Sequence, residues 1–417
     1  GNGNGNSSSS SSQGTQPAAI FPEQSGASRL WAQGDTGSGV NVAVLDTGID
    51  QLSDFGGRLV GGVDLSGEGN PFQDSYGHGT FVAGLIAGNG ASSKGQYSGE
   101  APGAGLVSVK VAGASGQTDL ATVIAGVDWV IDNHRALNIQ VLNMSLGYEP
   151  ASSTAVNPLD IAVEKAWNAG VTVVTSAGNY GPYNGTITSP GDDPLVITVG
   201  AVDDMGQTNP ADDTMTDFSS TGPTNIDGWL KPDLVASGRS VVSLAAPGST
   251  VYEQNPSALI GSANFVGSGT SFSAAITSGA AALLIEKDPG ITPNEVKAQL
   301  LGSASPGPVG NPLVDGHGVL NVYGAATDGP VGSVQLTQAS ASIMQLLAGL
   351  ESYSSTSGNV SLSTSWALSS WNPSNWMVTR SWNSPTLNGE AWNGEAWNGE
   401  AWNGEAWNGE AWNGEAW

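Results

Sequence analysis

The chain has 417 residues, which is enough for one large domain with tails, and 39% of them are hydrophobic. It carries 37 acidic and 11 basic residues, a formal net charge of −26, which argues against nucleic acid or an anionic membrane as a partner because both need basic patches. The chain has no cysteine and no run of 18 apolar residues, so neither disulfides, thiolate metal sites nor a transmembrane helix are expected.

The first residues are Gly, Asn and Ser repeats, which predict a disordered, low-complexity N-terminal segment over residues 1–19. The sequence starts at Gly1 without a methionine or a signal peptide. We therefore expect a processed or truncated form, with any targeting segment and propeptide upstream.

Residues 20–326 alternate between apolar runs and helical patterns, which is typical of an α/β domain. Such a chain forms a parallel twisted sheet with helices on both faces, and function gathers at the carboxyl ends of the strands. The predicted strands, rich in Val and Ile, are 40–45, 106–112, 139–146, 171–178 and 195–202. The predicted helices are 78–88, 119–137, 158–169 and one that opens with the capping box "TPNE" at 292–295.

The C-terminal part differs in composition from this domain. Residues 327–365 form a Ser/Gly-rich linker, and residues 366–417 form a Trp-repeat tail in which the unit "NGEAW" occurs six times from Asn388. A period of five fits neither a helix nor a strand. Two interpretations stay open for the tail: contact with glycans, cell wall or a cell surface by Trp stacking, or a solvated spacer that arose by repeat expansion.

Three stretches have the composition of a nucleophilic triad. Asp46 follows a predicted strand in "VAVLDTG", His78 lies between glycines at a helix start in "YGHGT", and Ser271 begins another helix in "GTSFSAA". A serine hydroxyl needs a base near neutral pH, histidine suits that role, and a carboxylate holds the imidazole in the right tautomer. The small residues around Ser271 leave room for a substrate backbone.

Each of these residues also has a structural interpretation. Ser271 is in a position typical of a helix cap, although Thr270 already offers a capping hydroxyl, and Asp46 could serve a turn. The other histidines, His134 and His317, are expected to be solvated or structural.

A fourth candidate follows the predicted strand 171–178. Asn179, in "TSAGNYG", offers a side-chain amide that can donate to the oxyanion of acyl transfer, and its alternative role is that of a turn residue.

In this order, "DTG", "HGT", "SAGN" and "GTS" resemble the motifs of the subtilisin-like serine peptidases, the subtilases, over about residues 35–326. Further stretches that match are 143–147, 196–202, 231–236 and 316–325. The resemblance implies a subtilisin-like fold and a secreted serine endopeptidase of broad specificity that works through an acyl-enzyme on protein or peptide substrates. It assigns orientation to Asp46, the base to His78, nucleophilic attack to Ser271 and the oxyanion hole to Asn179.

The resemblance also implies a substrate cleft. Its lining is expected to comprise Ser145, Leu146 and Gly147, with Ser176, Ala177 and Gly178. The backbone of 145–147 would pair with an extended substrate as an added strand, which tolerates many sequences.

The sequence departs from the family pattern in two respects. Ala275 stands where a proline is usual, and the stretch after the His78 helix lacks the Asn-rich calcium loop of well-known subtilisins. Asp54 alone is a weak calcium candidate, so we predict no metal site and no cofactor, with calcium possible but without a clear ligand set.

Two other functions are alternatives for this chain. A sedolisin-like peptidase would carry Glu in place of His78 and Asp in place of Asn179. A catalytically degenerate subtilase-like scaffold, whose Trp tail binds cell-wall or glycan surfaces, is the second alternative.

Overall fold

The computed structural model describes residues 19–328, 351–354, 359–362 and 380–381. The predicted N-terminal segment, except for Ala19, lies outside the described residues. The same holds for most of the linker and for the Trp-repeat tail apart from Arg380 and Ser381.

The domain is built on an eight-stranded sheet in the order β2-β3-β1-β5-β6-β7-β8, with β9 also pairing with β7. All of its neighbouring strands are parallel except β7 and β8. Its strands are β1 Asn41–Asp46, β2 Leu59–Asp64, β3 Gly105–Lys110, β5 Ile139–Met144, β6 Thr172–Ser176, β7 Ile197–Asp203, β8 Thr214–Met215 and β9 Leu234–Ser237. Val and Ile fill the central strands, which are buried on both faces, as parallel sheets require.

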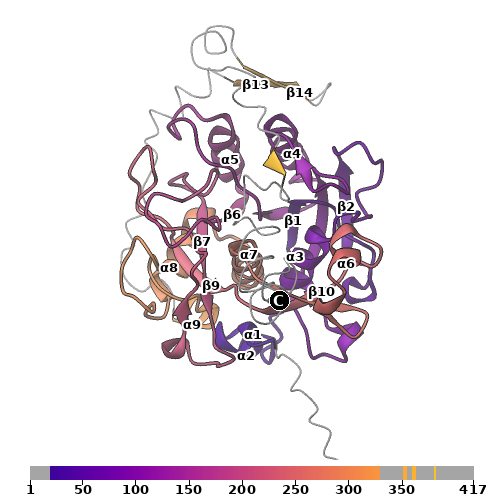
Figure 1. Cartoon of the computed structure of the whole chain (residues 1–417), viewed down its shortest axis with the longest axis vertical. Helices are drawn as coiled ribbons and strands as arrows, with labels where there is room; N and C mark the ends of the chain where they lie inside the picture. The colour runs from indigo at the N-terminus through magenta and orange to yellow at the C-terminus, as the bar shows by residue number, and fades with distance from the viewer. Residues whose placement is uncertain (1–18, 329–350, 355–358, 363–379, 382–417) are drawn as a thin grey trace, which may run out of the picture.

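Helices cover both faces of this sheet (Figure 1). The helices α3 His78–Ala87 and α7 Thr270–Lys287 pack on one face, and α4 Leu120–Asn133 and α5 Pro158–Asn168 pack on the other. The shorter helices are α1 Phe21–Gln24, α2 Ala27–Trp31, α6 Thr250–Gln254, α8 Pro293–Ser303 and α9 Val322–Thr327. The α/β fold class predicted from the sequence is confirmed.

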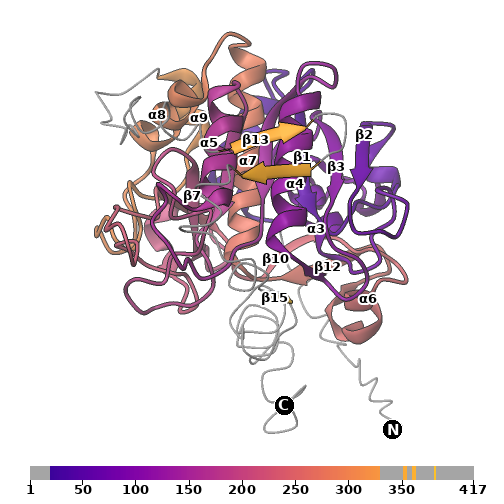
Figure 2. The same cartoon turned by 90° about the horizontal axis from the view of Figure 1, so that it is seen from above.

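Smaller elements surround this core. A three-stranded antiparallel sheet comprises β10 Val241–Leu244, β12 Asn264–Gly267 and β11 Leu259–Ile260. The antiparallel pair β13 Glu351–Ser354 and β14 Asn359–Leu362 lies over α4 (Figures 1 and 2), and β15 Arg380–Ser381 pairs with β4 Gln117–Thr118. Short 3₁₀ turns are Ser53–Phe55, Ala91–Ser93, Pro210–Asp212 and Pro256–Ala258.

The helix α7 runs through the centre of the molecule and is buried along nearly its whole length, from Thr270 to Ile285. Its many alanines favour a helix and let α3 and the sheet approach it closely. A helix that is apolar on all sides is stable only inside a large core. The first residues of α7 are therefore held rigidly.

The capping box predicted at 292–295 is present at the start of α8. The Thr292 hydroxyl accepts from the Glu295 amide at 3.3 Å, and the Glu295 carboxylate accepts from the Thr292 amide at 2.8 Å. In the described part of the chain, none of the helices is long and apolar enough to cross a bilayer.

Candidate active site

The order of the strands in the sheet reverses at β1. The strand β1 lies between β3 and β5 in the sheet. The chain first forms β2 and β3 on one side of β1, and then crosses to form β5 and the later strands on the other side. Ligands of open α/β sheets bind at such a switch point, outside the carboxyl ends of the strands. Asp46 is the last residue of β1.

Asp46 and His78 form a buried pair. The Nδ1 atom of His78 lies 2.7 Å from Oδ1 and 2.8 Å from Oδ2 of Asp46, and both residues are fully buried. A carboxylate only accepts, so it fixes the proton on Nδ1 and leaves Nε2 as the acceptor of the neutral ring.

Thr47 and Asp74 hold this pair in place. The Thr47 amide donates to Asp46 Oδ1 at 2.8 Å, and the Thr47 hydroxyl accepts from the Gly79 amide and donates to Asp74, both at 2.8 Å. Asp74 also accepts from the Gly77 and Thr80 amides at the start of α3, and burial raises its pKa. Asp74 was not among the residues predicted from the sequence, although an acidic residue just before a helix start is a recognisable signal.

Ser271 is the second residue of α7 and is 3% exposed. Its hydroxyl donates to the Ser145 carbonyl at 3.1 Å, and the Ser145 hydroxyl donates to the Ser271 carbonyl at 2.6 Å. The next residue, Phe272, packs its ring against the His78 imidazole, with centroids 5.6 Å apart. The start of α7, which carries Ser271, therefore lies beside His78, although 193 positions separate Ser271 from His78 along the chain.

Asn179 lies next to Ser271 through Thr270. Its Oδ1 accepts from both the amide and the hydroxyl of Thr270, each at 2.9 Å. Because the Thr270 amide can only donate, the atom facing it must be the oxygen, which leaves the Asn179 NH₂ group on the other side. The structural interpretation of Ser271 as a helix cap is wrong, and the hydroxyl of Thr270 does not cap α7 either, since this helix has no side-chain cap.

The other histidines lie apart from this cluster. His134 donates from Nδ1 to the Ile131 carbonyl at the end of α4, and His317 donates to the Asp233 carbonyl at 3.1 Å. Both serve local structure.

Comparisons with known proteins identify the family of this chain. The profile of the subtilase family matches residues 37–326, which is more than half of the chain. The chain belongs to the subtilase family.

Named relatives of this subtilase are serine proteases. It is 42% identical over 291 residues to the serine protease AprX of Bacillus subtilis, covering 69% of this chain and 66% of AprX, just under two thirds. It is 36% identical over 302 residues to subtilisin E of the same species, covering 72% and 69% of the two chains. The enzyme class that the family and these relatives support is that of a serine-type endopeptidase.

A solved structure shares the fold. The crystal structure of a cold-adapted subtilisin-like serine proteinase aligns with a TM-score of 0.52 and 31% identity, over 69% of this chain and 90% of that chain.

The two segments expected to line the cleft of this subtilase differ in their backbone hydrogen bonds. Ala177 donates its amide to Val199 and accepts from the Thr188 amide, and Gly178 donates to the Thr270 hydroxyl. Within the described residues, by contrast, the backbone groups of Leu146 and Gly147 make no such bonds. The segment 176–178 is thus a support. In 145–147 the Ser145 carbonyl accepts from the Ser271 hydroxyl, and the backbone of 146–147 is the part that is open to a partner.

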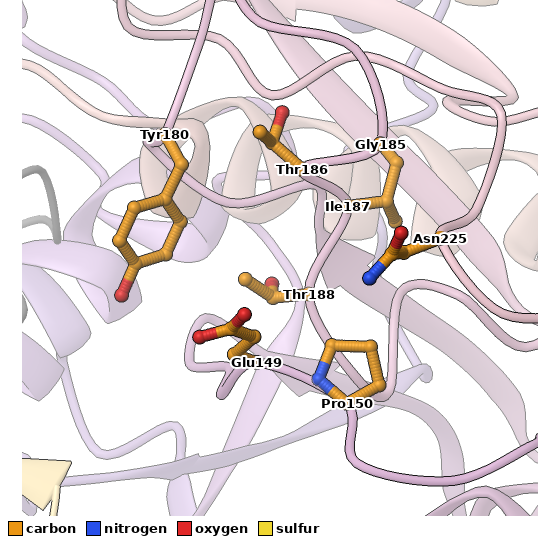
Figure 3. Close-up of a pocket in the computed structure, with 8 residues that line it drawn as sticks. All are labelled: Glu149, Pro150, Tyr180, Gly185, Thr186, Ile187, Thr188 and Asn225. Atoms are coloured by element: carbon orange, nitrogen blue, oxygen red, sulfur yellow. The ribbon is translucent and has the colours of Figure 1, made fainter.

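A cavity of about 160 Å³ adjoins these segments (Figure 3). It is lined by Glu149, Pro150, Tyr180, Gly185, Thr186, Ile187, Thr188 and Asn225. Figure 3 shows Tyr180, which follows Asn179, on one side of the cavity and Glu149 with Pro150 on another. Apart from Glu149 the lining is neutral, and the volume suits one amino-acid side chain rather than a large ligand.

The residues present do not fit a calcium ion at Asp54. Its carboxylate accepts from the Ser92 amide and hydroxyl, both at 3.0 Å, and from Ser53 at 3.2 Å. Hydrogen-bond donors thus face both oxygens, whereas a cation needs oxygen lone pairs around it. No three acidic or histidine side chains in the described residues are arranged to hold a metal ion.

Proposed function

We propose that this subtilase is a secreted serine endopeptidase of broad specificity in which Asp46, His78 and Ser271 form the catalytic triad and Asn179 the oxyanion hole. The observation that carries the proposal is the fully buried Asp46–His78 hydrogen bond beside the start of α7. An aspartate bonded to one imidazole nitrogen prepares the other nitrogen to act as a base.

The reaction begins at the hydroxyl of Ser271. In the substrate complex this hydroxyl, which donates to the Ser145 carbonyl, turns to His78, because catalytic hydrogen bonds often tighten only when substrate is bound. The oxygen attacks the scissile carbonyl carbon while Nε2 of His78 takes the proton. His78 then gives this proton to the leaving amine, which leaves an acyl-enzyme that water hydrolyses by the same steps.

The negative oxygen of the tetrahedral intermediates needs donors that are already in position. The Asn179 amide is held by two hydrogen bonds from Thr270 to its oxygen, so its NH₂ group needs no reorganisation. The backbone amides at the start of the 18-residue helix α7 add the positive end of the helix dipole.

Broad specificity follows from how the substrate would bind. An extended peptide that pairs with the backbone of 145–147 is held by main-chain hydrogen bonds, which do not depend on side chains. The cavity beside Tyr180 would then take the side chain that precedes the scissile bond. Such an enzyme would damage the proteins of its own cell, which favours secretion.

A covalent serine-directed inhibitor tests the proposal. The full chain is incubated with casein across pH 4–10, with and without a fluorophosphonate and with and without EDTA. We expect the inhibitor to abolish hydrolysis and peptide mapping to place the label on Ser271. A label on another residue, or casein hydrolysis that continues after full labelling, would refute the triad. A chain that neither reacts with the fluorophosphonate nor cleaves casein would be a catalytically inactive scaffold.

Glu149 gives a prediction on specificity. Because it is the only charged residue lining the cavity and is exposed, we expect Glu149→Gln to raise kcat/KM about two- to fivefold for substrates with Asp or Glu before the scissile bond, the range of an exposed charge pair. Lys and Arg substrates should lose a similar factor, and Leu substrates should not change.

Competition among peptides in a library measures this profile. The matched control is Glu23→Gln on α1, an exposed glutamate that does not line the cavity, which should leave the profile as it is. An unchanged profile in Glu149→Gln would show that the cavity does not receive this side chain.

A further inference from the structure

Four buried carboxyl groups lie under the wall of the cavity. Asp160 and Glu164 lie on one face of α5, four positions apart, and Asp192 and Asp193 lie in the turn that precedes β7. None is more than 3% exposed. We call these four residues the carboxyl cluster.

Each member of the carboxyl cluster has one oxygen without a hydrogen-bond donor. The four oxygens, all buried, are Asp160 Oδ2, Glu164 Oε2, Asp192 Oδ1 and Asp193 Oδ2. The side chains of Glu164 and Asp193 lie within hydrogen-bond reach of each other. Two ionised carboxylates cannot form such a bond because both only accept, so one of them must carry a proton.

Burial raises the pKa of Asp192 and Asp193, and the charge of Lys231 lowers it again in part, but the two nearby lysines direct their donors to other partners. Lys231 donates its three protons to the Val196 carbonyl, the Thr198 hydroxyl and Asp233. Lys297 donates to the carbonyls of 194–196 and also pairs with Asp233. A lysine has three donors, so both are committed to other partners.

Among the described residues, Tyr148 also faces the cluster, and it is neutral. Burial, and then the charge of Asp160, raise its pKa. No three acidic side chains in the described residues are arranged to hold a metal ion. Protons bound to the carboxyl groups would supply the donors that the cluster lacks.

The cluster is connected to the cavity wall through Ser189. The Ser189 hydroxyl donates to Asp160 Oδ1 at 3.0 Å, while its backbone exchanges two hydrogen bonds with Tyr148, at 2.9 and 3.1 Å. Thr188 and Glu149, the neighbours of these two residues, line the cavity. Repulsion within the cluster would thus act directly on the wall.

We propose that the carboxyl cluster is a proton-operated support: protons bound to it hold the cavity wall in place in acid and neutral solution, and their loss in alkaline solution loosens the wall. The part that concerns substrate binding rests on the proposed function, while the part that concerns stability does not.

The pKa values agree in direction with this geometry. Burial, followed by the charge of Asp193, raises the pKa of Glu164 to about 9. Burial and the same neighbour raise the pKa of Asp192 to about 7, and the pKa of Asp160 is also raised by burial and then by its acidic neighbours. A group with a raised pKa binds its proton more tightly in the folded state. Its stabilisation is complete below the unfolded-state pKa, near 4, and is lost as the pH rises to between 7 and 9.

The test compares thermal unfolding midpoints of the full chain between pH 5 and pH 9, with Ser271→Ala in the background to prevent self-digestion. We expect the midpoint to fall by about 10 °C over this range, and Glu164→Gln to reduce the fall by about half, because the neutral amide can donate to Asp193 as the protonated acid does. If Glu164→Gln does not fold, Asp192→Asn is expected to show the same effect between pH 6 and 8.

Kinetics distinguish a role at the cavity from a merely structural one. With Ser271 intact, KM of the unsubstituted chain should rise about threefold from pH 7 to pH 9, and Glu164→Gln should keep KM level. The matched control is Glu100→Gln. Burial raises the pKa of Glu100 to about 8, but this residue bonds Ser25, so its variant should alter the pH dependence of stability and leave that of KM unchanged.

Three results would overturn the proposal. The first is a midpoint with the same pH dependence in Glu164→Gln as in the parent chain. The second is a KM that changes with pH to the same extent in Glu164→Gln and in Glu100→Gln. The third is recovery of the midpoint at pH 9 by Ca²⁺ or Mg²⁺ in the parent but not in Glu164→Gln, which would make the cluster a cation site. Failure of the proposed function, by contrast, would leave the unfolding experiment in Ser271→Ala intact.

Discussion

Replacing Ser271 by alanine is expected to lower kcat by about six orders of magnitude, because without the nucleophile only substrate binding and oxyanion stabilisation remain. The measurement is initial-rate hydrolysis of a chromogenic peptide at pH 8, with refolded enzyme of known concentration. KM should change little, since the hydroxyl adds nothing to binding of the ground state.

The same helix offers a matched control for this variant. Ser273 is equally buried and donates to the carbonyls of Ala236 and Ser237, so Ser273→Ala makes the same substitution two residues further along α7. We expect it to lower stability by about 1 kcal/mol and kcat by less than tenfold.

A double variant adds a stricter criterion. If Ser271 and His78 act as a unit, His78→Ala alone and the pair together should lose about as much activity as Ser271→Ala alone. A double variant whose loss of activity equals the product of the two single losses would contradict a triad. A Ser271→Ala enzyme with more than about 1% of the parent activity would contradict it as well.

The elements that carry the site could be predicted from the sequence because their signals are local. Asp46 ends a Val-rich strand, and His78 begins a helix after glycine. The structure brings these two side chains together and places the start of α7 beside His78. The boundaries were less predictable: the helix expected to end at 137 ends at Asn133, and β2 was missed because Gly61 and Gly62 interrupt its apolar pattern.

The parts that depend on distant contacts could not be predicted. Asp160 and Glu164 are acidic residues four apart on a helix, a pattern that normally marks a solvated face. They are buried because α4, the strand β6 and the turn at 192–193 lie against α5, which no local pattern reveals. The hydroxyl of Thr270 is a similar case, since its partner Asn179 is 91 positions away.

Asp233 gives the largest expected effect on stability. It is the shared partner of two buried lysines, 2.7 Å from Lys231 Nζ and 3.2 Å from Lys297 Nζ. Burial alone would raise the pKa of Asp233, but these two cations outweigh burial and hold the pKa below its ordinary value. Asp233→Asn removes the only negative charge that both lysines contact in the described residues and leaves two buried cations facing each other. We expect it to lower the free energy of unfolding by about 3–5 kcal/mol at pH 7.

Denaturant unfolding in the Ser271→Ala background measures this loss. The control is Asp35→Asn, the same substitution in the more exposed pair of Asp35 with Lys287, 3.2 Å apart, which should cost less than about 1 kcal/mol. The pH dependence gives a second check. Folding lowers the pKa of Asp233, so its stabilisation is present above about pH 4 and is lost as the pH falls further. The unfolding free energies of the variant and the parent should therefore converge in acid.

Adding Lys297→Met to Asp233→Asn should recover part of the lost stability, since one of the two buried cations is then removed. A cost for Asp233→Asn no larger than that for Asp35→Asn, or no recovery in the double variant, would mean that these lysines are not held by the charge of Asp233.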